Sequence, residues 1–194
     1  MGVIIIFRLV YRLWAGLGWG LDDWFVLLTG LVSSPSIGIG IHGTIPNGLG
    51  RDVWTLSFDQ ITKFGFYFYI QAVLYFAEVS LLKMSILYFY LRIFPERKIR
   101  LVLYGTMVAN AMSGIAYVVA AIFQCWPISY NWTRWDQQHE GKCVNITALA
   151  WSNAIVSIVF DFWMLAIPLS QLRKLKLHWK RKIGVGLMFG VGTL

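Results

Sequence analysis

Charged side chains are scarce in this sequence, and long stretches of it contain none. Only 13% of the 194 residues are Asp, Glu, Lys or Arg, whereas soluble domains carry about a quarter of such residues. Hydrophobic residues make up 58% of the chain. This composition excludes an ordinary soluble domain and favours a protein embedded in lipid.

Catalytic and metal-binding motifs are also missing. His42, His139 and His178 stand far apart, and the sequence has no HExxH, GxSxG, Walker or CxxC pattern. We therefore expect no enzyme activity, no metal site and no cofactor. The net charge of +8 comes from short basic clusters between apolar runs, so we also expect no nucleic-acid binding.

Four apolar runs are long enough to cross a bilayer, which takes about 20 helical residues. They predict an all-α, polytopic transmembrane helical bundle over a single domain, residues 1–194, with spans at about 22–42, 64–92, 101–125 and 146–170. Shorter apolar pieces at 1–7 and 183–194 predict partial spans. Pro35 should kink the first run, with a nearby serine bonding the freed carbonyl. In the third run Gly105, Ala109 and Ser113 predict close helix packing.

Basic residues are distributed unevenly beside these spans. Segments 8–20, 92–100 and 171–182 hold twelve Lys and Arg residues, against four on the other side. The positive-inside rule then places loops 93–100 and 171–182 in the cytoplasm and loops 43–62 and 126–145 outside, and we expect the plasma membrane. The densest cluster favours either an anchor on anionic lipid or a docking face for a cytoplasmic partner; it comprises Arg173, Lys174, Lys176, Lys180, Arg181 and Lys182.

The only two cysteines are Cys125, directly before the segment 126–145, and Cys143 within it; the segment also holds sequons at Asn131 and Asn145. An outside location favours a disulfide and glycosylation at both asparagines. The disulfide would stabilise the fold by about 3 kcal/mol in the loop-entropy model. Two free thiols are the alternative.

Three ionisable residues lie inside the predicted spans: Glu78, Lys83 and Asp161. Each costs roughly 2.5–3.5 kcal/mol at mid-membrane, so they should face the bundle interior and pair. Their depths predict a Lys83–Asp161 pair with Glu78 nearby. A structural pin between two helices is the simpler interpretation, and a role in binding a ligand or ion, or in switching, is the alternative.

Several short motifs, in order, resemble the fungal rhodopsin-domain integral membrane proteins, a seven-span, receptor-like family. The resemblance covers about residues 20–190 and rests on Asp22-Asp23-Trp24, on Lys83-x-Ser85-Ile86-Leu87-x-x-Tyr90-x-Arg92-Ile93-Phe94, on Phe123-Gln124-Cys125-x-Pro127, on Gly141-x-Cys143, and on Asp161 with Pro168. Compared with seven spans, the chain would be truncated at both ends.

The resemblance implies a receptor-like sensor that couples an external cue, through an extracellular ligand, to a cytoplasmic signalling partner. Two other classes stay open. One is a carrier or channel-like protein with a polar path through Glu78, Lys83 and Asp161. The other is a structural membrane protein that does not signal.

Overall fold

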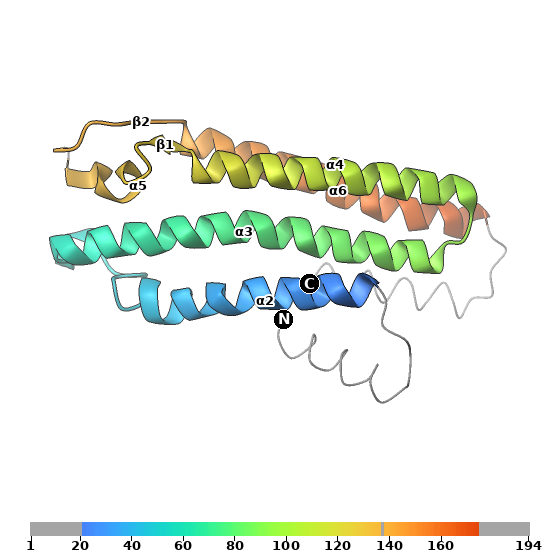
Figure 1. Cartoon of the computed structure of the whole chain (residues 1–194), viewed down its shortest axis with the longest axis horizontal. Helices are drawn as coiled ribbons and strands as arrows, with labels where there is room; N and C mark the ends of the chain where they lie inside the picture. Colours follow the sequence, from blue (N-terminus) through green and yellow to red (C-terminus); the bar gives the residue numbers. More distant parts are fainter. Residues whose placement is uncertain (1–20, 137, 175–194) are drawn as a thin grey trace. The chain divides into compact units, whose positions relative to one another are not determined.

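A computed structural model describes residues 21–136 and 138–174 of the chain (Figure 1). Four long helices dominate it: α2 (Leu21–Ile39), α3 (Phe58–Ile93), α4 (Arg97–Ile122) and α6 (Ile146–Lys174). Short elements connect them, namely η1 (Gly40–Thr44), η2 (Val53–Thr55), β1 (Cys125–Trp126), α5 (Tyr130–Thr133), η3 (Arg134–Asp136) and β2 (Lys142–Cys143). The all-α fold class is therefore confirmed.

Within the described residues, four helices are long and apolar enough to cross a membrane: Trp24–Thr44, Phe58–Ile93, Arg97–Ile122 and Ile146–Ser170. The chain forms two compact units, residues 1–146 and 147–194, which are described separately. The first unit holds α2, α3, α4 and the disulfide segment, and the second holds α6. The predicted partial spans 1–7 and 183–194 lie outside the described residues, as do Lys176, Lys180, Arg181 and Lys182 and the side chains of Arg173 and Lys174.

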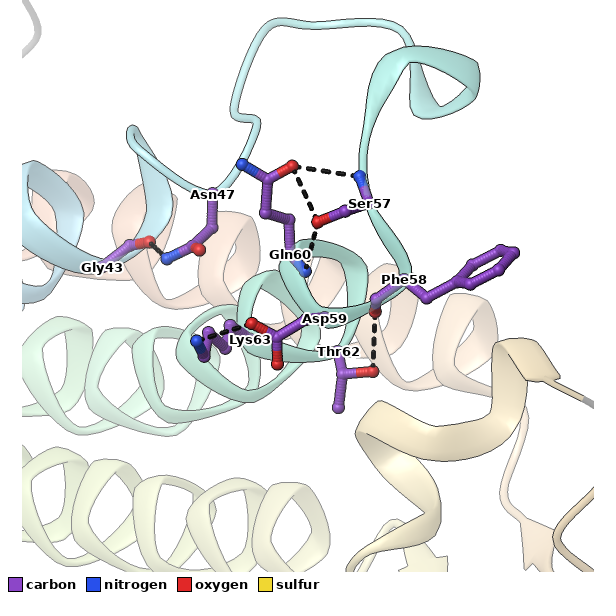
Figure 2. A network of polar contacts seen from close by, with 8 residues as sticks. All are labelled: Gly43, Asn47, Ser57, Phe58, Asp59, Gln60, Thr62 and Lys63. Carbon is purple, nitrogen blue, oxygen red and sulfur yellow. Dashed lines mark hydrogen bonds and ion pairs between the residues drawn. The ribbon is translucent and has the colours of Figure 1, made fainter.

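Helix α3 begins at Phe58, six residues before the predicted span, because a capping box starts it there. The Ser57 hydroxyl accepts a hydrogen bond from the Gln60 backbone N–H at 3.4 Å, and Gln60 Oε1 accepts one from the Ser57 N–H at 3.0 Å (Figure 2). Lys63 then pairs with Asp59 one turn back, at 2.7 Å (Figure 2). These polar residues read as a loop in the sequence, yet they satisfy the free N–H groups of a helix start.

Helix α2 has two irregular features, a proline within the helix and a π turn directly after it. Pro35 has no N–H to give to the Leu31 carbonyl, and the Ser34 hydroxyl donates to that oxygen instead at 3.3 Å. The predicted serine bond is thereby confirmed. The helix then widens into a π turn at Gly40–Thr44, where the Thr44 hydroxyl donates to the Ile39 carbonyl at 3.2 Å. At both positions a side-chain hydroxyl group donates to a backbone carbonyl, as is needed in lipid, where water cannot do so.

Helices α3 and α4 lie side by side (Figure 1) and approach each other most closely at a small residue, Gly114. The Asn110 amide donates to the Ser80 carbonyl at 3.0 Å. A Cβ built on Gly114 would lie 2.6 Å from Ser80 Cβ, whereas a Cβ on Gly105 would have no atom within 4 Å. Gly105 therefore makes no close helix contact among the described residues, and the face of α4 that meets α3 carries Asn110 and Gly114.

We predict that Gly114→Ala destabilises the protein by roughly 1–3 kcal/mol, because its methyl group would push α3 and α4 apart. Gly105→Ala is the matched control on the same helix. It should be neutral or stabilise by up to about 1 kcal/mol, because alanine restricts the unfolded chain. Thermal unfolding of both variants in nanodiscs measures the difference, and equal effects would contradict this packing.

Candidate functional site

One face of α3 lies against α2, and two side-chain contacts set the register between the two helices. The Thr44 hydroxyl donates to Gln71 Oε1 at 3.3 Å near one end. Near the other end Phe25 stacks on Tyr88 with ring centroids 4.8 Å apart. The helices are therefore antiparallel, and an α3 residue between Gln71 and Tyr88 lies level with the middle of α2.

Polar residues recur every seven positions along this interface. On α3 they are Gln71, Glu78 and Ser85, and on α2 they are Thr29 and Ser36. Seven residues make nearly two helical turns, so each series stays on one face. Thr29 is 2% exposed and Ser85 is 6% exposed. We call these five residues the polar seam.

Glu78 lies at the centre of the polar seam. It is seven residues after Gln71 and ten before Tyr88, which brings it level with Ser36 of α2, directly after Pro35. Its Oε1 atom is buried and has no hydrogen-bond partner among the described residues. A buried polar atom without a partner is costly, and more so in lipid, where water cannot compensate. Glu78 is therefore a polar residue of this interface whose Oε1 atom is not satisfied by the described residues.

Lys83 lies on the other face of α3, the one that meets α4. It is 6% exposed and shares this face with Ser80, Leu87 and Tyr90. Five residues along a helix rotate the direction by about 140° relative to Glu78. The structure therefore does not bring Glu78 and Lys83 together. Asp161 lies near the middle of α6 in the second unit, and the Lys83–Asp161 pair stays a prediction.

The disulfide between Cys125 and Cys143 is present, as predicted from the sequence. The two cysteines are also paired residues of the short antiparallel ladder between β1 and β2. The Val144 N–H donates to the Gln124 carbonyl at 2.8 Å, which extends the ladder by one bond. We call the segment between the cysteines, residues 126–142, the disulfide loop. Both of its ends are held at the end of α4.

Two tryptophans attach the disulfide loop to the first three turns of α3. Trp132 meets the ring of Phe66 edge-on at a centroid distance of 5.1 Å, and its Cβ would lie 3.2 Å from a Cβ built on Gly65. Trp135 stacks on Phe58 at 5.4 Å and donates its indole N–H to the Thr62 hydroxyl at 3.1 Å. The disulfide loop therefore packs against one side of α3.

The two sequon asparagines differ in their surroundings. The Asn131 side chain is held on both sides, because its Nδ2 donates to the Ile128 carbonyl at 3.0 Å and its Oδ1 accepts from Gln124 Nε2 at 2.6 Å. Asn145 is exposed, directly before the start of α6. The sequence pattern of the two sequons does not reveal this difference.

An exposed turn after η3 is fixed by Asp136. The backbone N–H of Gln138 donates to Asp136 Oδ1 at 3.0 Å, and His139 Nδ1 lies 2.9 Å from Oδ2. These contacts, the backbone bond first, hold the pKa of the Asp136 carboxyl below its ordinary value. The carboxylate is therefore ionised at neutral pH and caps this turn.

Comparison with known proteins identifies the family. The family model described as "Fungal rhodopsin domain" matches residues 7–194. The chain belongs to the fungal rhodopsin-domain family. It is accordingly a multi-pass membrane protein whose long helices lie in a lipid bilayer.

Several fungal relatives share this domain. "Fugralins biosynthesis cluster protein 2" of Gibberella zeae is 29% identical over 73% of this chain and 36% of its own length. A "SAT4 family membrane protein" of Emericella nidulans is 29% identical over 62% and 31%. "Polyenoic acids biosynthesis gene cluster protein Ba17b" of Metarhizium anisopliae is 23% identical over 89% and 47%. The chain thus spans about a third to a half of the length of these curated relatives. No solved structure matches it.

Sequence reasoning missed the polar seam of this fungal rhodopsin-domain protein. A signal was available, since Gln71, Glu78 and Ser85 are spaced by seven, as are Thr29 and Ser36. Reading the ionisable residues alone grouped Glu78 with Lys83. The missing step was to ask which helix each face of α3 meets.

Proposed function

We propose that this chain is the core of a receptor-like sensor, in which α3 couples an external cue to a cytoplasmic partner. One observation carries the proposal: α3 is a single helix of 36 residues that is attached to the disulfide loop at one end and turns into α4 at the other. A helix of that length reaches about 54 Å, longer than the bilayer core. A shift of the loop can therefore be transmitted along one rigid element.

The orientation that we propose follows from the basic residues. Loops 43–62 and 126–145 are outside, and loops 93–100 and 171–182 face the cytoplasm, with the plasma membrane as the location. The disulfide supports this orientation, because disulfides form in oxidising compartments. The basic cluster that begins at Arg173 would then lie at the cytoplasmic surface, where anionic lipid or a signalling partner can bind it.

The external cue that we propose is a small molecule. Two relatives carry names that place them in biosynthesis clusters, one for fugralins and one for polyenoic acids. The carrier hypothesis has less support, because a single polar path through Glu78 and Lys83 would have to pass from one face of α3 to the other. A structural protein without signalling would need no link between the disulfide loop and the far end of α3.

That link can be tested with one fluorescent label. Both native cysteines are in the disulfide, so Ile93→Cys, at a position 42% exposed at the far end of α3, provides one reactive thiol. Trp132→Ala removes one of the two aromatic anchors of the loop. We expect it to shift the emission and iodide quenching of the label, because the helix loses its restraint at the other end.

The matched control for this experiment is Trp54→Ala, since Trp54 is 93% exposed and should leave the label unchanged. Limited proteolysis of the disulfide loop verifies that Trp132→Ala has released it. If the released loop leaves the label at residue 93 unchanged, the sensor proposal fails.

Sidedness is tested by glycan mapping. We infer that the exposed Asn145 carries a glycan and that Asn131, whose amide is engaged on both sides, does not. Asn145→Gln should abolish the mobility shift caused by a peptide glycosidase. Thr133→Ala removes the first sequon while keeping the Asn131 amide, and it should change nothing. An unmodified chain whose disulfide loop is digested from the cytosolic side would refute the orientation.

A further inference from the structure

The carboxyl group of Glu78 has no positively charged partner from the two helices that form the polar seam. Helix α2 and η1 contain no Lys or Arg between residues 24 and 44. The face of α3 that meets α2 contains none either, because Lys83 lies on the face that meets α4. With Oε1 buried and unbonded among the described residues, the negative charge on Glu78 is not balanced by either helix.

Hydroxyl oxygens that can bind a cation lie on α2 opposite Glu78. Ser36 lies at the level of Glu78, and Ser33 lies about one turn nearer the start of α2; both are half-buried. Discontinuities in membrane helices are a recurring feature of ion sites within the bilayer, and Pro35 lies directly before Ser36.

We propose that the polar seam binds an alkali-metal cation, with Glu78 as its charged ligand. Carboxylate and hydroxyl oxygens are hard ligands that suit such an ion. A single carboxylate balances one positive charge, so a monovalent ion fits better than a divalent one. The bound ion would tie α2 to α3 at mid-membrane. This inference does not depend on whether the protein signals.

The test measures thermal unfolding of the purified chain in nanodiscs by tryptophan fluorescence, in sodium, potassium or choline chloride at equal ionic strength. Sodium or potassium should raise the Tm of the unmodified chain by about 3 °C or more above its value in choline, in a saturable way. Glu78→Gln should abolish the rise, because it keeps the shape of the side chain and removes its charge.

Matched variants separate this site from general salt effects. Glu140→Gln, in the exposed part of the disulfide loop, should keep the full rise. Ser36→Ala keeps the carboxylate but removes one oxygen ligand. It should raise the half-maximal cation concentration several-fold, whereas Ser152→Ala, at an exposed serine of α6, should not. Ser36→Ala also serves as the test if Glu78→Gln fails to fold.

Two results would overturn the proposal. One is an identical Tm in sodium, potassium and choline for the unmodified chain. The other is a cation-dependent rise of the same size in Glu78→Gln or, should that variant not fold, an unchanged half-maximal concentration in Ser36→Ala.

Discussion

Lipid offers no hydrogen bonds, and this constraint determines which neighbouring helices the polar residues of α3 face. Every polar group that enters the bilayer needs a partner within the protein, either in its own helix or on a neighbouring one. On α3 such groups fall on two faces: Gln71, Glu78 and Ser85 face α2, while Ser80 and Lys83 face α4. The three helices of the first unit are therefore held together by polar contacts as well as by apolar packing, with α3 in the middle.

Helix α3 also extends beyond its neighbours at the end where the disulfide loop contacts it. The Tyr69 hydroxyl bonds to the carbonyl of Ile122, where α4 ends, and Gln71 meets Thr44, where the π turn of α2 ends. The first three turns of α3 therefore extend beyond both partners, and the disulfide loop covers one side of them through Trp132. One rigid element thus joins a tethered aromatic loop to the polar centre of the bundle.

Much of the fold could be predicted from the sequence, because long apolar runs, two cysteines and Ser34-Pro35 each imply a local structure. Two features were beyond that reasoning. The start of α3 looked like a loop, since Ser57 and Gln60 are polar, although their spacing is that of a capping box. The seven-residue spacing indicates a polar face on each helix. Which faces meet depends on the register between α2 and α3, and spacing within one helix does not reveal that register. The family was recognised from the order of several short motifs. Membership of the family predicts membrane topology more directly than it predicts function.

Cysteine cross-linking across α2 and α3 tests the register most directly. Ser36→Cys is combined with Glu78→Cys in one protein and with Lys83→Cys in another, and both are oxidised in native membranes. A protease site inserted into loop 45–57 then separates the helices unless a bond joins them. The account predicts efficient cross-linking for position 78 and little for position 83. Equal cross-linking, or a preference for position 83, would contradict the two-faced arrangement of α3.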